Sequence, residues 1–395
     1  MMRLFINSLA ASAGGGLTYI RNVLPQMAAR ADVQVVVTLS SDLRREFREY
    51  ANIQFVELDG SLTRRFWHEQ SRLPGLIRRH GADVLLSTGN FALRKPGVPQ
   101  ILLSRNSVYT SADFYRDLRS RHEYRTWLDT HLRAVLAKRS ILWADCTVAP
   151  SNAFAAELRF WTGKQVHAIH HGFDREAFVS DETPLSAEVQ EQLERAGGAL
   201  RLLFVSHYNY YRNFETLIRA LPLLRRLLPG RTVRLFLTCK LRAGENPGAY
   251  DPQAAAKLVK ELGVSDMVVE LGSVPYRQLH QVSRRANIYV SPAYTETFAH
   301  PLVEAMASGL PVVASNLAVH QEICGDAARY FSRFSPPELA ESVARIAESG
   351  PTATRMAEAG LERARQFSWK THVDQILKLA QTLCDGRQKA QPALR

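Results

Sequence analysis

Short apolar runs alternate with helix-length amphipathic stretches along almost the whole chain, and this alternation limits the fold more than any other feature. Such runs are typical of buried strands, and their alternation with helices is typical of a parallel α/β sheet. A first series of runs lies at 4–6, 33–38, 54–58, 84–86, 100–103, 146–149 and 166–169. A second series lies at 202–205, 233–237, 268–271, 288–290, 311–314 and 329–331. The sequence therefore predicts two doubly wound α/β domains.

The interval between the two series marks the expected domain boundary. Residues 175–199 are polar and only loosely helical in pattern, so we expect the first domain to span 1–172 and the second to span 173–368. A chain of 395 residues is long enough for two domains with separate cores. A last helix is expected at 369–385, and residues 386–395 are expected to be a disordered tail.

Composition disfavours several classes of protein. Apolar residues make up 46% and charged residues 22%, as in an ordinary soluble protein. No run reaches the ~18 apolar residues of a membrane span, and the opening residues turn polar too early for a signal peptide. The cysteines lie far apart without metal-ligand spacing, which favours buried free thiols in a reducing compartment; they are Cys146, Cys239, Cys324 and Cys384. Neither Asp-x-Asp nor G-x-G-x-x-G occurs, so we expect no metal site and no dinucleotide cofactor.

Positive charge is concentrated in the first half of the chain. Residues 1–172 hold 23 Lys and Arg but 14 Asp and Glu, a surplus of 9 out of the net charge of +12. This surplus suggests a polyanionic neighbour, which would be nucleic acid, anionic lipid or a phosphorylated acceptor. A merely soluble basic surface explains it equally well. Nucleic acid is the least favoured partner because the chain contains no recognised nucleic-acid-binding motif.

Residues 62–80 and 113–139 carry most of this surplus. The second segment has an apolar stripe, with arginines near its edges; the stripe consists of Tyr124, Leu128, Leu132 and Val135. Trp67 and Trp127 also lie among arginines. The pattern fits a helix that docks on an anionic membrane surface. It fits an ordinary sheet-covering helix with one solvated face at least as well.

The segment from Ser291 to Ser315 carries the clearest chemical pattern in the chain. An apolar strand run is followed by a polar loop with Glu296, and then by Pro301, a residue favoured at the start of a helix. We expect Glu304 in the first turn of that helix. Backbone N–H groups at a helix start bind anions, and two flanking carboxylates suit a ligand rich in hydroxyls.

The sequence Glu296-Thr-Phe-Ala-His-Pro-Leu-Val-Glu304 resembles the E-x7-E signature of the retaining glycosyltransferases of family 4, also called glycosyl transferases group 1. The family usually has Gly-x-Pro where this chain has Ala299-His-Pro301. The resemblance implies the GT-B fold, in which two Rossmann-like domains face each other across a cleft and a C-terminal helix crosses back onto the first domain. It also implies that the first domain binds an acceptor and the second a nucleotide-diphospho-sugar.

The resemblance extends to the turn after the first strand of the second domain. Residues 206–213 resemble the G-R-x4-K-(G/N) turn, whose two cations neutralise the leaving diphosphate. His207 takes the Arg position and Arg212 takes the Lys position. By the same resemblance, Glu304 would accept hydrogen bonds from the ribose hydroxyls and Glu296 from those of the transferred sugar. His207, Arg212 and Glu296 are therefore the expected catalytic residues.

Further contacts are implied by the resemblance alone. The donor would touch residues around the two glutamates and in two other loops, namely Thr297, Phe298, Ala299, His300, Leu302, Val274 in the base-reading loop, and Gly15 and Gly16 in a glycine loop after the first strand. Many family members have a His that faces the acceptor where this chain has Arg105 and Asn106. Residues 169–174 resemble the family's NGVD segment at the domain junction.

Together these features predict a metal-independent hexosyltransferase that needs no cofactor. It would move a sugar from a nucleotide-diphospho-sugar to a glycan or lipid-linked acceptor, in the biosynthesis of cell-envelope polysaccharide. Its expected location is the cytoplasm, either free or at the cytoplasmic face of the membrane. The alternative is a non-catalytic nucleotide- or sugar-binding protein on the same fold. The sequence indicates neither the donor base, the sugar and the acceptor nor the linkage and oligomeric state.

Overall fold

The computed structural model describes residues 1–11, 14–59, 65–246, 248 and 250–390. The chain divides into two compact units, each continuous in space but not in sequence. Unit 1 consists of Met1–Thr110, Glu123–Gly172 and Ser368–Arg395. Unit 2 consists of Ser111–His122 and Phe173–Phe367.

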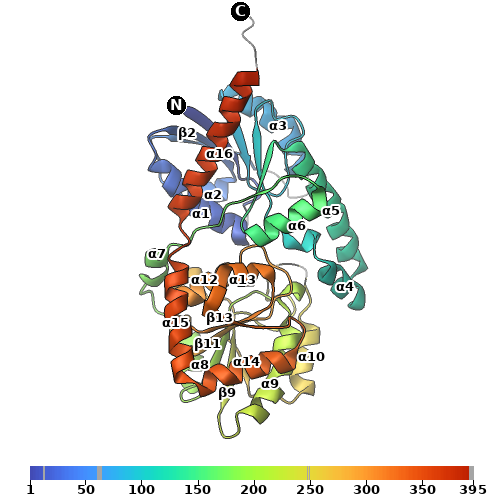
Figure 1. Ribbon diagram of the computed structural model, residues 1–395, viewed down its shortest axis with the longest axis vertical. Helices are drawn as coiled ribbons and strands as arrows, with labels where there is room; N and C mark the ends of the chain where they lie inside the picture. Colours follow the sequence, from blue (N-terminus) through green and yellow to red (C-terminus); the bar gives the residue numbers. More distant parts are fainter. Residues whose placement is uncertain (12–13, 60–64, 247, 249, 391–395) are drawn as a thin grey trace, which may run out of the picture. The chain divides into compact units, whose positions relative to one another are not determined.

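Unit 1 is built on a seven-stranded sheet with the order β3-β2-β1-β4-β5-β6-β7 (Figure 1). Every paired strand in it is parallel. The strands are β1 (Met2–Asn7), β2 (Val33–Leu39), β3 (Ile53–Glu57), β4 (Val84–Ser87), β5 (Gln100–Leu103), β6 (Cys146–Ala149) and β7 (His167–Ala168). The middle residues of the five inner strands are buried on both faces, which is why these strands form unbroken apolar runs in the sequence, whereas the edge strands β3 and β7 are partly exposed.

Helices cover both faces of this sheet. They are α1 (Gly14–Ala28), α2 (Ser41–Arg44), α3 (Arg65–Arg79), α5 (Tyr124–Trp143), α6 (Asn152–Thr162) and α16 (Trp369–Ala390), with a 3-10 turn, η1, at Ser107–Tyr109. The long helix α16 lies beside α1 (Figure 1). Its apolar side chains, among them Val373 and Ile376, share a core with the strands of unit 1. The predicted return of the last helix to the first domain is therefore confirmed.

Helix α16 is longer than predicted. It continues to Ala390, so residues 386–390, expected to belong to a disordered tail, are helical. Asp385 accepts a hydrogen bond from Gln381 one turn earlier, and Arg387 donates one to the Gly97 carbonyl. These contacts support the added turn. Residues 391–395 lie outside the described part of the chain.

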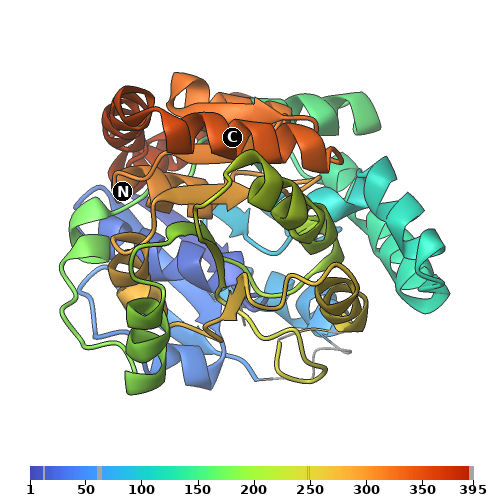
Figure 2. The same cartoon turned by 90° about the horizontal axis from the view of Figure 1, so that it is seen from below.

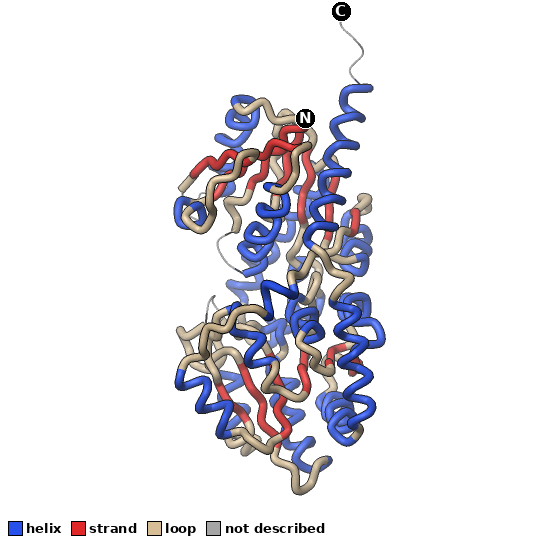
Figure 3. The backbone as a smooth tube through the Cα atoms, turned by 90° about the vertical axis from the view of Figure 1, so that its left-hand side faces the viewer, coloured by secondary structure: helices blue, strands red, loops and turns tan. Residues whose placement is uncertain are grey.

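Unit 2 repeats the architecture with a six-stranded sheet of order β10-β9-β8-β11-β12-β13. All of its strand pairs are parallel, and Figure 3 shows the strands of each sheet in red. The strands are β8 (Leu200–Phe204), β9 (Val233–Leu237), β10 (Val268–Glu270), β11 (Ile288–Ser291), β12 (Val312–Ser315) and β13 (Ala328–Phe331). Each predicted run coincides with a strand in both units, with ends that differ by one or two residues.

Two groups of helices cover the faces of this second sheet (Figure 2). One group contains α9 (Phe214–Leu227), α10 (Gln253–Glu261) and α14 (Pro336–Glu348). The other contains α7 (Arg175–Val179), α11 (Leu279–Ser283), α12 (His300–Ala307), α13 (Ala318–Cys324) and α15 (Gly350–Ala364). The remaining elements are α4 (Ala112–Ser120), α8 (Ala187–Arg195), and the 3-10 turns η2 (Tyr210–Arg212), η3 (Tyr276–Gln278) and η4 (Gly325–Ala327). Among the helices described in both units, none has the length and apolarity needed to cross a membrane.

Helix α4 differs from the expected division of the chain. The sequence predicts one N-terminal domain over 1–172, yet residues 111–122 pack with unit 2. Polar contacts account for this. Asp113 pairs with Arg333 at 2.6 Å, and Asp117 accepts a hydrogen bond of 2.7 Å from the Tyr294 hydroxyl. Such long-range polar pairs leave no periodic pattern in the sequence.

Residues 169–174, which resemble the family's junction segment, are shaped by a close approach of two chain segments. A Cβ on Gly172 would lie 2.0 Å from the backbone nitrogen of Trp369, so only glycine fits there. The His171 ring packs on the Trp369 ring. Asp174 accepts a hydrogen bond from the Ala177 N–H and so caps α7. The segment is thus explained by local structure.

Candidate active site

The candidate donor site of unit 2 lies where its strand order reverses. Strands β8 and β11 are neighbours in the sheet, and the chain leaves them toward β9 and β12 on opposite sides. Loops that follow such strands diverge and leave room for a ligand at the C-terminal edge of the sheet. His207 and Arg212 follow β8, and Glu296 follows β11. The topology therefore brings the three predicted catalytic residues to one edge.

Glu296 and Arg212 form a direct ion pair. Arg212 Nη1 donates to Glu296 Oε2 at 2.5 Å, and the exposed fractions of the two side chains are 20% and 12%. The second carboxylate oxygen, Oε1, accepts from the Thr297 N–H at 3.0 Å. Burial acts to raise the pKa of Glu296, but the Arg212 charge and the Thr297 N–H outweigh it and lower the pKa. Glu296 is therefore a charged acceptor at neutral pH.

Arg212 retains an unused donor. Burial opposes its charge, but Glu296 more than compensates and raises the pKa of Arg212. Its Nε is buried and has no hydrogen-bond partner. A buried N–H without a partner is costly unless a ligand or water supplies an acceptor. This guanidinium is thus placed to bind an additional anion.

The next residue explains the (G/N) position of the predicted turn. Asn213 has φ +58°, in the left-handed region that Asn tolerates better than most residues. Its Nδ2 donates to the carbonyls of Pro292 at 3.0 Å and Arg333 at 2.6 Å. Asn213 therefore ties the loop that carries Arg212 to the loop that carries Glu296.

His207 lies on the same loop but is exposed to solvent. Partial burial and the charge of Arg212 both lower its pKa below the ordinary value of 6.5. The imidazole is therefore mainly neutral at pH 7 in this structure. At pH 7 a bound anion would raise the pKa of His207 and favour the charged imidazolium.

Helix α12 begins at a strained residue. Ala299 has φ +64°, where the family's usual glycine would be free of strain. The first turn of the helix has no side-chain cap, Pro301 lacks an N–H, and the Leu302 N–H donates to the Ala299 carbonyl at 2.9 Å. The helix dipole favours an anion at this position.

Glu304 lies deeper than the sequence suggests. The helix starts at His300, so Glu304 is in its second turn. The prediction that it lies in the first turn was wrong. The side chain is buried, with 8% exposed. Burial raises the pKa of Glu304 to about 7, although the Tyr276 hydroxyl, which hydrogen-bonds the carboxyl group, acts to lower it. Tyr276 was not predicted; its only signal is its position directly after the Val274-Pro275 loop.

The other predicted donor contacts differ in what their side chains can reach. Phe298 and Leu302 are fully buried, and Phe298 packs on Phe367 with ring centroids 5.3 Å apart. These two residues belong to the core, so only their backbone could meet a ligand. Thr297, His300 and Val274 are partly exposed.

Unit 1 brings Arg105 to Gly15 and Gly16, which lie in the first turn of α1 and not in a loop as predicted. Arg105 Nη1 donates to the Gly15 carbonyl at 2.9 Å and Nη2 to the Thr88 carbonyl at 2.6 Å, while the buried Nε has no partner. Burial lowers the pKa of Arg105 to about 10. A Cβ on Gly16 would lie 3.3 Å from the Ala11 Cα, whereas Gly15 has open space. Gly16 therefore serves packing, and Gly15 is the position open to a ligand.

Asn106 has a local role in the same region. Its Oδ1 accepts from the Val108 N–H at 3.3 Å and caps the turn η1. The backbone of Arg105 is held by Asn90, because the Arg105 backbone N–H donates to Asn90 Oδ1 at 2.6 Å.

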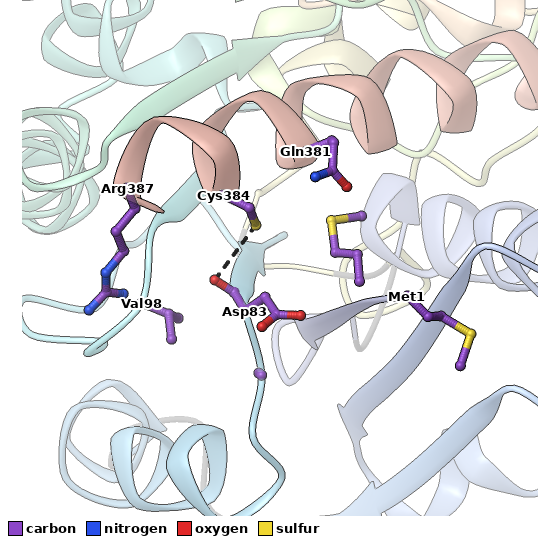
Figure 4. A pocket seen from close by; sticks show the side chains of 8 residues that line it. Met1, Asp83, Val98, Gln381, Cys384 and Arg387 are labelled. Carbon is purple, nitrogen blue, oxygen red and sulfur yellow. Dashed lines mark hydrogen bonds between the residues drawn. The ribbon is translucent and has the colours of Figure 1, made fainter. Parts of the chain in front are cut away.

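A cavity of about 480 Å³ in unit 1 lies away from both sites (Figure 4). It is lined by residues next to the starts of β1 and β4 and by one side of α16, including Met2, Asp83 and Cys384. Ligands of parallel α/β sheets bind at the opposite, C-terminal edge of the strands. Cys384 Sγ there lies 3.9 Å from the Asp83 carbonyl. The cavity therefore adds nothing to the candidate active site.

Metal ligands and disulfides are not found in the described residues. Those residues contain no group of three or more His, Cys, Asp or Glu able to hold a metal ion. Cys146, Cys239 and Cys324 are buried free thiols, as predicted, and Cys384 is a half-buried one.

Two family models match this chain and together span most of it. The model described as Glycosyltransferase Family 4 matches residues 13–177, and the model described as Glycosyl transferases group 1 matches residues 186–363. The chain belongs to glycosyltransferase family 4. The predicted resemblance is thereby confirmed on both halves of the chain.

Curated relatives of this family 4 member include D-inositol 3-phosphate glycosyltransferases. That of Corynebacterium aurimucosum is 28% identical over 213 residues, which are 53% of this chain and 49% of the relative. That of Corynebacterium efficiens is 31% identical over 192 residues, which are 46% of this chain and 44% of the relative. The chain thus spans about half the length of these relatives or less.

Solved structures share the fold over the whole chain. Sucrose-phosphate synthase from Thermosynechococcus elongatus has a TM-score of 0.75 at 19% identity, covering 98% of this chain and all of the other. Anabaena HepE, solved in complex with UDP-glucose, has a TM-score of 0.71 at 16% identity and covers 97% and 100%. The predicted GT-B fold class is confirmed.

Proposed function

We propose that this family 4 member transfers a sugar from a nucleotide-diphospho-sugar to a hydroxyl of an acceptor, with retention of anomeric configuration. The observation that carries the proposal is the arrangement at the strand reversal of unit 2. There the buried Arg212–Glu296 pair, which retains an unused N–H on Arg212, lies at the same sheet edge as the N-terminal end of α12.

The leaving diphosphate sets the chemical requirement. Breaking the bond between sugar and phosphate develops negative charge on the diphosphate, and fixed donors aimed at that charge lower the barrier. Arg212 offers a permanent cation with a free Nε, and the N-terminal end of α12 offers the positive end of the helix dipole. These groups supply the stabilisation without a metal. Metal independence is part of this proposal.

The two glutamates are assigned different hydroxyls. Glu304 is buried beside Tyr276, and a carboxylate there accepts from both ribose hydroxyls of the nucleotide. Glu296, charged and next to Arg212, accepts from the hydroxyls of the transferred sugar. As in the family, the departing phosphate takes the acceptor's proton on the same face of the sugar.

The acceptor is proposed to be a glycan or lipid-linked molecule used in cell-envelope polysaccharide biosynthesis. The relatives named as D-inositol 3-phosphate glycosyltransferases suggest a phosphorylated acceptor as a further choice. Arg105 would suit either a phosphate or a diphosphate-linked lipid, because no carboxylate among the described residues pairs with it.

The test begins with donor identity. UDP-, GDP-, ADP- and TDP-sugars are screened for an increase in melting temperature, and UDP-glucose comes first because HepE was solved with it. The selected donor is then incubated with candidate acceptors, and the product's anomeric configuration is read by NMR. Turnover with retention is expected. A product of inverted configuration, or no stabilisation by any nucleotide-sugar, would overturn the proposal.

A non-catalytic nucleotide- or sugar-binding protein is the second candidate. Two differences from the family's usual residues favour this candidate. His207 stands in place of a permanent cation, and the strained Ala299 stands in place of glycine. Such a protein would bind the donor without turnover. Single-turnover measurement with radiolabelled donor distinguishes the two.

We also propose that unit 1 contacts an anionic membrane through one face of α5. Four large apolar side chains on this helix are 43–62% exposed and form what we call the α5 stripe: Leu128, Leu132, Val135 and Leu142. The residues of α5 that are buried are small or lie on the other side, such as Ala134 and Ala137. Tyr124, at the start of the helix, is exposed as well.

Charge favours a lipid surface over a second copy of the chain. At ~100° per residue, Arg139 falls within the α5 stripe, and Arg125 and Lys138 flank it on either side. The stripe and its flanks are therefore both apolar and basic, as in helices that lie in an anionic interface. Two copies of this basic surface would repel each other. Helix α5 lies at the outer edge of unit 1 in Figures 1 and 2.

A further inference from the structure

Helix α4 brings a chain of polar contacts to the loops that carry the proposed catalytic pair. Asp117 Oδ2 accepts from the Tyr294 hydroxyl at 2.7 Å, and Asp117 Oδ1 accepts from Arg121 Nε at 2.7 Å. Arg121 Nη1 in turn donates to Glu215 Oε1 at 3.0 Å. We call Asp117, Arg121, Tyr294 and Glu215 the α4 brace.

The brace is well shielded from solvent. The side chains of Asp117 and Arg121 are each 19% exposed, and that of Glu215 is 16% exposed. Glu215 also accepts from the Tyr208 hydroxyl at 2.9 Å. Shielded, charge-assisted hydrogen bonds are stronger and more directional than surface ion pairs. The brace therefore has the properties of a fixed connection.

Each end of the brace meets a loop of the candidate site. Tyr294 is two residues before Glu296, and its N–H donates to the Tyr211 carbonyl at 3.0 Å. Tyr211 precedes Arg212, and its ring packs edge-on against Phe114 of α4. On the other side, the Arg121 guanidinium lies 4.3 Å from the centroid of the Tyr210 ring. The segments that carry Arg212 and Glu296 are thus bonded to each other, and helix α4 contacts both of them.

We propose that Asp117 and Arg121 of α4 are positioning residues that hold Arg212 and Glu296 in their reactive geometry. Glu296 lies in a loop and Arg212 at the end of the short 3-10 turn η2, and such connecting segments are more mobile than the strands they follow. A misplacement of about 1 Å at a reacting centre costs up to ~100-fold in rate. The brace limits such displacement by fixing Tyr294 and Tyr210, each of which lies two residues before a member of the pair. The inference rests on the proposed transfer activity.

Helix α4 packs with unit 2 but is connected along the chain to unit 1. Its segment leaves unit 1 after Thr110 and returns to it at Glu123, so both of its ends are covalently joined to unit 1. At the return, His122 has φ +60°, an uncommon backbone conformation for a non-glycine residue. A residue from the N-terminal half of the chain thus supports the donor site of the C-terminal half.

The test removes single groups of the brace. Tyr294→Phe deletes one hydroxyl, and Asp117→Asn keeps the shape of the side chain. Each is expected to lower kcat about tenfold with little change in donor KM, because nucleotide affinity depends on other groups. Tyr330→Phe is the matched control: its hydroxyl donates to the Gly325 carbonyl at 2.7 Å in the same unit, and its loss should leave kcat unchanged.

A double-mutant cycle separates positioning from general loss of stability. In a Glu296→Gln background, Tyr294→Phe should reduce kcat by less than twofold, because both changes act on the same carboxylate. Fully additive losses would mean that Tyr294 acts elsewhere. Wild-type kcat in both Tyr294→Phe and Asp117→Asn would overturn the inference while leaving the proposed function intact.

A second readout does not depend on turnover. Amide hydrogen exchange in residues 207–213 and 292–298 should become faster in Tyr294→Phe than in Tyr330→Phe, because the brace no longer restrains those loops. If the wild-type protein shows no transfer with any donor, the proposed function fails, and this measurement still decides whether the brace exists. Equal exchange in both variants would refute the brace.

Discussion

Arg212 donates a hydrogen bond of 2.5 Å to Glu296, so the proposed phosphate-binding cation is already paired with the proposed sugar-binding carboxylate. The pair is nearly buried, and the Nε of Arg212 has no partner. A diphosphate can therefore bind Nε without breaking the ion pair. The same contact would keep Glu296 ionised and in place while charge develops on the leaving group.

The first prediction separates the roles of the two glutamates. Glu304→Gln should weaken nucleoside diphosphate binding by roughly 1–3 kcal/mol, the cost of losing a charged hydrogen-bond acceptor. Glu296→Gln should leave nucleotide affinity within a few-fold and chiefly lower kcat, because Glu296 acts on the sugar during transfer. Calorimetry with the nucleotide and steady-state kinetics measure the two effects. Small and equal effects of both substitutions in folded protein would rule out this site.

The second prediction concerns metal ions. Because Arg212 and the start of α12 would stabilise the diphosphate, a chelator should leave the transfer rate unchanged. Arg212→Ala should lower kcat severely, by about 100-fold or more, the cost typical of losing such a group, and Arg212→Lys should recover part of it because the charge returns without the fork geometry. Loss of activity with chelator that Mg²⁺ or Mn²⁺ restores would contradict the mechanism.

The third prediction tests the strain at Ala299. A left-handed conformation costs an alanine roughly 1–2 kcal/mol, and glycine avoids this cost while losing about 0.5–1 kcal/mol of chain entropy. Ala299→Gly should therefore increase the free energy of unfolding by up to about 1.5 kcal/mol. Urea denaturation of unit 2 measures it, with Ala305→Gly in the interior of α12 as a control that should destabilise. Destabilisation by both substitutions would show that Ala299 is not strained.

The fold was predictable because both faces of the parallel strands are buried. Segments such as Val35–Val37 and Ile288–Val290 are therefore unbroken apolar runs, and helices separate them. The assignment of helix α4 to unit 2 could not be predicted, because no sequence pattern reports it. Its attachments join residues that are far apart in sequence, such as the hydrogen bond of Asp117 with Tyr294 and the ring contact of Phe114 with Tyr211, and no periodicity reports such pairings.

The candidate site was predictable only where a motif spans it. Glu296, Glu304 and Arg212 were found because their spacing resembles a family signature. Tyr276, which hydrogen-bonds Glu304, and His320, which acts with Arg212 and the Thr297 N–H to lower the pKa of Glu296, belong to no such pattern. His320 is fully buried, its Nδ1 lies 3.0 Å from the Ser315 carbonyl, and its Nε2 has no partner. A single aromatic or histidine in a sequence carries no sign of the contacts that folding gives it.

The fourth prediction concerns pH. Glu304, with a pKa of about 7 in the folded protein against an ordinary 4.5, keeps a proton that the unfolded chain has lost between those values. Its contribution to stability therefore falls as pH rises from about 4.5 to 7 and is constant above. Nucleotide affinity should rise through pH 7, because only the carboxylate accepts from both ribose hydroxyls. Glu304→Gln should remove this rise.

His207 should have the opposite effect on the pH dependence of nucleotide affinity, which should fall at alkaline pH. Its pKa lies below 6.5 in this structure, and a bound diphosphate would raise it. The affinity that its charge provides is complete below the lowered pKa and is lost as pH rises through the raised one. Dissociation constants measured from pH 5 to 9 should therefore pass through an optimum. His207→Arg should remove the alkaline limb; coincident limbs in wild type and His207→Arg would show that His207 is no charge partner of the diphosphate.

The last prediction concerns the α5 stripe. Wild-type protein should co-sediment with vesicles that contain anionic lipid, and the bound fraction should fall with salt, since the ~10 Å screening length at 0.1 M weakens the contribution of Arg125, Lys138 and Arg139. Leu128→Ser with Leu132→Ser should abolish binding at low salt, because the apolar contact is lost as well. Leu227→Ser is the control, since Leu227 is 42% exposed on α9 of the other unit. Binding that ignores lipid charge, or sedimentation of a dimer that the double substitution dissociates, would mean that the α5 stripe serves another partner.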